Sequence, residues 1–183
     1  MRAAFAAAVA LHTRVADART DAIVDAAVLI RVALGAGRKV LVFGNGGSAT
    51  DAEHFAAELV GRFGRHIERP GLPVLALTTD SAVMTSVAND FGYRAVFARQ
   101  IEAFGVNGDI AVALTTSGKS ENINEALRWA LDRGLKTVAL TGADGGQSGR
   151  LADVHVNVPD DNPARVQEVH RTILHVMCEL IEA

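Results

Sequence analysis

The sequence contains a single cysteine, Cys178, among its 183 residues, so no disulfide can form within the chain. Proline is also scarce, with four residues, and no proline-rich or low-complexity stretch marks a linker between domains. Hydrophobic residues make up 49% and charged residues 21%, a globular balance that excludes a disordered chain. We expect one compact domain over residues 1–183, with a buried, inert thiol and a reducing environment.

The chain also has no excess of positively charged residues. The chain has 18 lysines and arginines against 21 aspartates and glutamates, a formal net charge of -3. It therefore has no basic field to hold nucleic acid. No apolar run approaches the roughly 20 residues that cross a bilayer. We expect neither a nucleic-acid partner nor a membrane.

The opening segment permits two interpretations. Ala3–Leu11 after Arg2 resembles the apolar core of a signal peptide, and Ala16–Ala18 resembles a cleavage site. Alanine is only weakly hydrophobic, however, and His12 and Arg14 interrupt the segment. We favour a helix of the mature, cytoplasmic protein whose apolar face meets a partner.

The first 36 residues differ in pattern from the rest. Residues 1–18 and 20–35 are predicted as two helices that serve oligomerisation and end near Gly35–Gly37, because glycine terminates helices. Beyond them, short runs rich in Val and Leu alternate with helical stretches, which predicts an α/β three-layer sandwich around a five-stranded parallel sheet. The predicted strands are Lys39–Phe43, Val74–Leu77, Ile110–Leu114, Thr137–Leu140 and Val154–Val158, and the helices are about 48–63, 81–104, 120–133 and 163–182.

Glycine gathers directly after the first predicted strand, in Gly44–Ala49. A loop of this kind between a strand and a helix presents free amides and the positive end of the helix dipole to an anion. The spacing also approximates a dinucleotide-binding fingerprint, but the acidic residue expected about 20 positions later at a strand end is absent. The loop indicates an anion site without a nucleotide cofactor, and a plain structural turn is the alternative.

A second strand-to-helix junction is rich in hydroxyl groups. The third predicted strand leads into Thr115–Ser120, whose four hydroxyls and first helical amides can donate to phosphate oxygens. Ordinary helix capping accounts for one or two of these hydroxyls, not four. Gly118–Ser120 also resembles the end of an ATP-binding P-loop, but Ala113 stands where that motif requires glycine. The carboxyl edge of the sheet is therefore predicted to carry a phosphate site.

Two pairs of candidate acid–base residues lie on predicted helices. His54 and Glu58 are four residues apart and project from one face, with a surface ion pair as the alternative. Gln167 and His175 are eight residues apart on the last helix, about 80° apart around its axis. A histidine such as His175, taken alone, is more often a core residue with its hydrogen bonds satisfied. The other histidines show no such partnership and are interpreted as structural or exposed: His12, His66, His155 and His170.

Together these segments resemble the sedoheptulose 7-phosphate isomerase family, also called phosphoheptose isomerases, within the sugar isomerase (SIS) domain superfamily. The resemblance covers nearly the whole chain. The resemblance runs through five segments: Val42–Ala49, Asp51–Leu59, Ala88–Tyr93, Thr116–Ser120 and Gln167–His170. Its most specific part is the joint presence of Glu58 and His175.

This resemblance implies a site and its ligands. It implies a homotetramer with sites shared between subunits, and a catalytic pair formed by Glu58 and His175. The substrate would contact Asn45, Gly46, Gly47, Ser48, Glu58, Asn89, Asp90, Thr115, Thr116, Ser117, Ser120 and Gln167. Zinc would be held by His54, Glu58, Gln167 and His175, of which only the glutamine is an unusual zinc ligand.

The resemblance also implies a reaction. Sedoheptulose 7-phosphate would be isomerised through an enediolate to D-glycero-D-manno-heptose 7-phosphate, supplying heptose for lipopolysaccharide or another surface glycan. Two alternatives stay open. One relative is a noncatalytic partner of the bacterial replication initiator, although it lacks the residues matching Glu58 and His175. The other alternative is an isomerase or a sugar-binding regulator for a different phosphosugar. Lys119 stands where the family commonly has a small polar residue, and this difference could alter which sugar is accepted.

Overall fold

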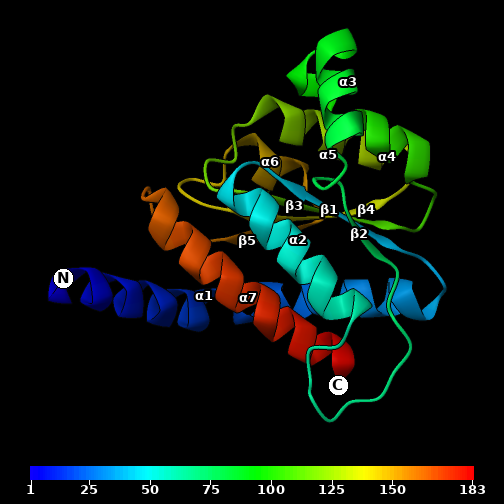
Figure 1. The fold of residues 1–183 in the computed structure, drawn as a ribbon. Coiled ribbons are helices and arrows are strands. Elements are labelled where there is room, and N and C mark those ends of the chain that lie inside the picture. Colours follow the sequence, from blue (N-terminus) through cyan, green and yellow to red (C-terminus); the bar gives the residue numbers. More distant parts are fainter.

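The computed structural model describes all 183 residues and contains one parallel sheet with helices on both faces (Figure 1). This confirms the predicted α/β class. The strands are β1 Val40–Gly44, β2 Val74–Ala76, β3 Ile110–Thr115, β4 Lys136–Thr141 and β5 Val154–Asn157. The helices are α1 Arg2–Gly35, α2 Gly47–Val60, α3 Ser81–Phe91, α4 Ala98–Phe104, α5 Glu121–Asp132, α6 Gly146–Leu151 and α7 Pro163–Glu182, with a 3-10 turn, η1, at Tyr93–Ala95.

Alternate residues of each strand enter different halves of the core, because successive side chains of a strand point to opposite faces. In β1, Val40 and Val42 pack in the cluster formed with α1, α2 and α7. Leu41 and Phe43 pack in a second cluster, formed with α4 and α5. All four side chains are fully buried. The predicted three-layer arrangement is therefore confirmed.

The order of the strands places the two predicted anion loops side by side. That order is β2-β1-β3-β4-β5, so the chain leaves β1 toward one edge and later continues from β3 toward the other. In open parallel sheets, ligands bind at the carboxyl ends of the strands that flank such a reversal. β1 and β3 are paired there, with Gly44 opposite Leu114. The loops that follow these strands are thus neighbours.

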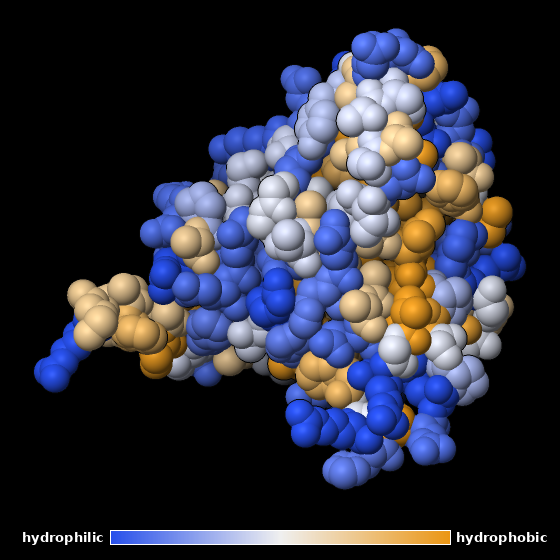
Figure 2. Space-filling view, in the orientation of Figure 1, coloured by the Kyte–Doolittle hydropathy of each residue, from blue (hydrophilic) through white to orange (hydrophobic).

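The N-terminal segment differs from the prediction of two helices. It is one helix of 34 residues, because the expected break contains no glycine or proline and the Thr20 hydroxyl bonds back to the carbonyl of Ala16. At 1.5 Å per residue α1 is about 51 Å long. Its N-terminal end extends beyond the sheet (Figures 1 and 2), where Phe5 and Val9 are exposed. Neither α1 nor any other helix is long and apolar enough to span a membrane.

The single helix predicted over residues 81–104 is also wrong. α3 ends at Phe91 because Gly92 adopts φ +81°, a left-handed conformation that glycine tolerates. η1 and α4 follow as separate elements. α3 contains no buried residue and projects from the body of the molecule (Figure 1). The short α6 was not predicted, since its six residues carry no apolar periodicity.

His170 is a structural residue of the core, as the sequence suggested. It is fully buried, and its Nε2 donates to the carbonyl of Thr141 at 3.1 Å. Its Nδ1 is the one buried side-chain nitrogen or oxygen without a partner. Burial lowers the pKa of His170 from 6.5 to about 4, against the opposing effects of the Thr141 carbonyl and the Asp51 carboxylate. The imidazole is therefore neutral in the folded chain at pH 7.

This neutral imidazole predicts acid-sensitive stability. As the pH falls through 6.5 toward 4, the unfolded chain takes up a proton on residue 170 before the folded chain does. Between pH 7.5 and 5 we expect His170 to remove about 2 kcal/mol from the free energy of unfolding. Urea titrations of the wild type and of His170→Gln measure the effect. The variant should show a smaller pH slope, and two parallel profiles would contradict neutral burial.

Candidate active site

The loop after β1 meets the first turn of α5 through a pair of asparagine side chains. Asn45 Nδ2 donates to Asn122 Oδ1 at 3.0 Å, and Asn122 Nδ2 donates back to Asn45 Oδ1 at 2.8 Å. The Tyr93 hydroxyl donates to Asn45 Oδ1 at 3.1 Å. Apart from one leucine, the residues lining the adjacent hollow all belong to the predicted substrate-binding set. The hollow, of about 60 Å³, is lined by Asn45, Ser48, Leu114, Thr115, Thr116, Ser120 and Gln167.

The hydroxyl-rich loop after β3 is held in shape by its own side chains. Thr115 Oγ1 accepts from the amide of Gly118 at 3.2 Å, and Ser117 Oγ accepts from the amide two residues later at 3.2 Å. Gly118 has φ +63°, and a Cβ on it would lie 2.1 Å from the carbonyl oxygen of Gly145. Any side chain there would collide with backbone. Ser120 is the N-cap residue of α5, so the hydroxyls of Thr115, Thr116 and Ser120 line the hollow next to the start of that helix.

The helices α2 and α7 pack side by side in the same direction and form a parallel seam (Figure 1). Ser48 of α2 and Gln167 of α7 line the hollow at one end of this seam. Gly47 faces the carboxamide of Gln167 so closely that a Cβ on the glycine would lie 2.7 Å from it. Each further turn of α2 meets the corresponding turn of α7. The contacts, in order along both helices, join Gly47 to Gln167, Asp51 to Arg171 and His54 to His175.

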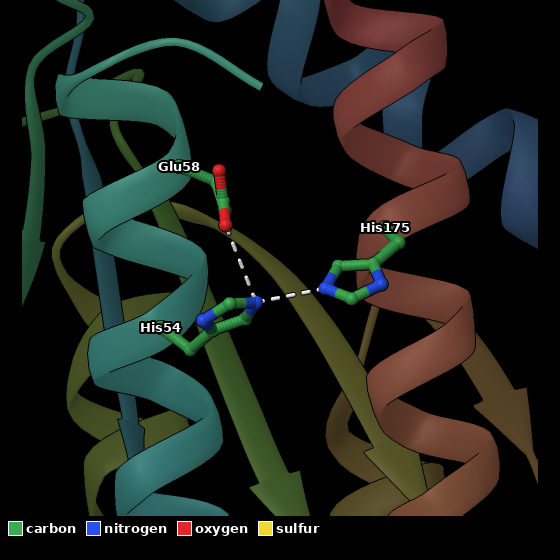
Figure 3. A group of neighbouring side chains, drawn as sticks. All are labelled: His54, Glu58 and His175. Atoms are coloured by element: carbon green, nitrogen blue, oxygen red, sulfur yellow. Dashed lines mark hydrogen bonds and ion pairs between the residues drawn. The ribbon is translucent and has the colours of Figure 1, made fainter. Parts of the chain in front are cut away.

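His54, Glu58 and His175 form one cluster at the far end of this seam (Figure 3). His54 Nε2 lies 2.7 Å from His175 Nε2 and 3.4 Å from Glu58 Oε1. The Phe63 ring packs on His175, with 5.4 Å between the ring centroids. Burial and the positive charge of Arg171 lower the pKa of His54 below 6.5, although Glu58 opposes them. The cluster thus joins a neutral imidazole to a carboxylate, two groups suited to proton transfer.

The cluster also fits a divalent metal ion. The ligating atoms of His54, Glu58 and His175 lie within 4.8 Å of one another, and two imidazoles with a carboxylate are a donor set that zinc accepts. Gln167, the fourth predicted ligand, starts two turns earlier on α7, about 12 Å along the axis. Its carboxamide faces Gly47 and lines the hollow. The structure therefore brings together three of the four predicted ligands. Metal binding by Gln167 stays a prediction.

Two predicted substrate residues, Asn89 and Asp90, do not line the hollow. Both are exposed on α3, which projects from the sheet (Figure 1). Their side chains bond to each other, Asn89 Nδ2 to Asp90 Oδ1 at 2.8 Å. Substrate binding by this pair stays a prediction.

The sequence did not point to Asn122 or Tyr93. Asn122 carried a usable signal, because it is an amide side chain in the first turn of the helix that follows the hydroxyl-rich loop. Tyr93 reaches Asn45 only because the chain turns at Gly92, a break that the local pattern did not reveal. Both residues orient the Asn45 side chain toward the loop.

Comparison with known proteins agrees with this geometry. Residues 5–142 match the family model described as SIS domain. The phosphoheptose isomerase of Geobacter sulfurreducens is 50% identical over 156 residues, 85% of this chain and 82% of the relative. That of Alkalilimnicola ehrlichii is 52% identical over 169 residues, 91% and 85% of the two chains. A solved phosphoheptose isomerase from Neisseria gonorrhoeae has a TM-score of 0.92 at 39% identity, over 98% and 95% of the two chains.

The sheet order, the paired loops and the family match define a SIS domain. Within that class the chain belongs to the phosphoheptose isomerase family, because relatives of that name share half of their residues with it over most of its length. The chain is therefore an isomerase. The resemblance drawn from the sequence motifs is confirmed.

Proposed function

We propose that the chain isomerises sedoheptulose 7-phosphate to D-glycero-D-manno-heptose 7-phosphate. The observation that carries this proposal is that α2 and α7, which hold the acid–base cluster, also each supply one residue, Ser48 and Gln167, to the lining of the hydroxyl-rich hollow. Ser48 in the hollow and His54 in the cluster are six residues apart on α2, about 9 Å along the axis. An extended sugar phosphate can bridge that distance with its phosphate at one end and its carbonyl at the other.

The cluster supplies the groups that the reaction needs. A ketose–aldose isomerisation removes a proton from one carbon, passes through an enediolate and returns the proton to the neighbouring carbon. We assign proton transfer at carbon to Glu58, and proton transfer at the sugar oxygens to His175. His54 Nε2, 3.4 Å from Glu58 Oε1, keeps that carboxylate oriented.

The phosphate end positions the reacting end. We assign the phosphate to the loop after β3, where hydroxyls surround the start of α5. Binding energy gained at this unreactive group holds C1 and C2 over Glu58 and so lowers the barrier. The residues assigned to the phosphate are Thr115, Thr116, Ser117 and Ser120, and those assigned to the sugar are Asn45, Gly46, Gly47, Ser48, Asn89, Asp90 and Gln167.

Zinc is the metal that we propose for this site, held by His54, Glu58 and His175 with Gln167 as the fourth ligand. The support is that the ligating atoms of His54, Glu58 and His175 lie within 4.8 Å of one another. Gln167 is included on the family resemblance alone. Bound zinc would supply Lewis acidity toward the sugar carbonyl. Metal analysis of the purified protein should find about one zinc per chain and much less in His175→Gln. Full activity of metal-free protein would overturn this assignment.

Turnover of three sugar phosphates tests the proposed reaction. Purified, zinc-loaded protein should convert sedoheptulose 7-phosphate with a kcat/KM at least about tenfold above the values for ribulose 5-phosphate and fructose 6-phosphate. Shorter sugars bridge the distance between the phosphate loop and the acid–base cluster less well. Equal rates would favour another phosphosugar as the substrate. No turnover at all would favour the noncatalytic partner of the replication initiator, against which the assembled Glu58 and His175 argue.

The proposal includes a homotetramer. Apolar side chains are exposed in two parts of α1, and the N-terminal end of this helix projects from the molecule (Figure 2). Phe5 and Val9 are exposed on the projecting end, and Val24, Val28 and Val32 farther along the helix. Burying these side chains against other copies would stabilise a helix end that makes few contacts in one chain. Light scattering at micromolar concentration should give about four times the mass of one chain, and an active monomer would contradict the proposal.

We place the enzyme in the cytoplasm, supplying heptose for lipopolysaccharide or another surface glycan. The thiol of Cys178 supports a reducing environment. It is fully buried, and burial raises its pKa to about 12, so it is protonated and unreactive at neutral pH.

A further inference from the structure

The loop after α2 is tied to the end of α7 by a buried ion pair outside the cluster. The side chain of Glu182 is 1% exposed, and its Oε1 accepts from Arg69 Nε at 2.9 Å and Nη2 at 2.6 Å. The same carboxylate accepts the backbone amides of Phe63 at 2.9 Å and Gly64 at 2.8 Å. Burial opposes ionisation, but these bonds outweigh it and hold the pKa of Glu182 below its usual 4.5. The pair is therefore charged at neutral pH.

Arg69 uses the rest of its guanidinium to cap α2. Its Nη1 donates to the carbonyl of Leu59 at 2.8 Å, and Nη2 donates to the carbonyl of Glu58 at 3.2 Å. Carbonyls of the last helical turn lack partners within the helix. A positive charge at this end is also favoured by the helix dipole. The guanidinium thus fixes the backbone of the glutamate in the cluster.

Phe63 connects the same ion pair to the other side of the cluster. Glu182 holds the Phe63 amide, and the Phe63 ring packs on His175 at an interplanar angle of 38°. The ring is partly buried against the core formed with α2 and α7. One carboxylate therefore fixes the surroundings of both Glu58 and His175, which stand on different helices (Figure 3).

We propose that Arg69 and Glu182 are positioning residues for the isomerisation. They act through the two residues that they hold in place, by fixing the Glu58 backbone and the aromatic wall beside His175. The inference rests on the proposed roles of Glu58 and His175. A displacement of about 1 Å in a reacting group can cost up to about a hundredfold in rate, so even a partial loosening of this pair should be measurable.

Glu182→Gln tests the inference. It keeps the shape of the side chain but removes its charge, and it places an NH2 group, which cannot accept, among the donors of Arg69, Phe63 and Gly64. We expect kcat to fall about tenfold and KM to change less than about twofold, since the phosphate loop lies at the other end of α2. Arg69→Lys keeps the charge but loses the forked contacts, and should lose part of kcat. The matched control is Glu179→Gln, an exposed glutamate on the same helix, which should behave as the wild type.

The ring resonances of His175 provide a readout that needs no turnover. The ring current of Phe63 shifts the proton and carbon signals of His175, so both Glu182→Gln and Phe63→Leu should move them. The signals of the distant His12 should stay in place in every variant. Should Glu182→Gln fold poorly, Arg69→Lys decides by the same two measurements.

The outcomes separate three cases. Loss of kcat together with a moved His175 signal supports positioning. A lower thermal midpoint with unchanged kcat and an unchanged His175 signal makes the ion pair merely structural and overturns the inference. If the wild type fails to convert the heptose phosphate, the proposed function fails, and the His175 signal still decides whether the ion pair positions this residue.

Discussion

Glu58→Gln should reduce the turnover of sedoheptulose 7-phosphate by about a thousandfold while KM changes little. Glutamine keeps the size and hydrogen-bonding capacity of the side chain but removes the basic carboxylate that stands 3.4 Å from His54 Nε2. Exchange of the substrate proton with deuterium oxide should disappear together with isomerisation, because both require the same proton abstraction. Steady-state kinetics and NMR of the exchange measure these two losses.

The metal is the main control for this variant, since Glu58 is also a predicted zinc ligand. Zinc content must be measured in the wild type and in Glu58→Gln, so that a lost base is distinguished from a lost metal. Glu53→Gln on the same helix is the matched control, because Glu53 accepts from the Thr78 hydroxyl outside the cluster. A folded, zinc-replete Glu58→Gln protein with a normal rate would rule out the assigned base.

The double variant Ser117→Ala and Ser120→Ala should raise KM at least about a hundredfold and lower kcat much less. Each lost hydrogen bond to a charged phosphate is worth about 1.5–3 kcal/mol. Ser117→Ala also removes the bond that Ser117 Oγ accepts from the Lys119 amide. The bond from the Gly118 amide to Thr115 Oγ1 and the close approach of Gly118 to Gly145 remain, so we expect the loop to stay folded. Steady-state kinetics and competition by inorganic phosphate measure the effect.

Ser86→Ala provides the control for this loop. Ser86 is exposed on α3, and its hydroxyl bonds within its own helix to the carbonyl of Val83. The substitution Ser86→Ala therefore removes a serine hydroxyl, as the double variant does, but at a position that does not line the hollow. An unchanged KM in a folded double variant would place the phosphate at another site.

The fold class was predictable because its signals are local. Short Val- and Leu-rich runs separated by helical stretches give a parallel sheet, and the loops at Gly44–Ala49 and Thr115–Ser120 follow paired strands as expected. His54 and Glu58 were predictable for the same reason, since a spacing of four places both on one helical face. The two errors, at the continuous α1 and at Gly92, concern where a helix stops.

Contacts between distant residues were beyond the reach of local patterns. His54 and His175 are 121 positions apart, and only the family resemblance suggested that they meet. Arg69 and Glu182 are 113 positions apart, and no motif marked either residue. A pairing of this kind is set by how α2 and α7 pack, which no single segment encodes.

The parallel seam of α2 and α7 also limits where the chain can change its length. Residues added in the loops between these helices leave the pairing of Gly47 with Gln167 and of His54 with His175 unchanged, because packing sets the register. One residue inserted within α7 between Gln167 and His175 would rotate every later side chain by about 100° and turn His175 off the seam. Family members should therefore differ in loop length while keeping the eight-residue interval between these two positions.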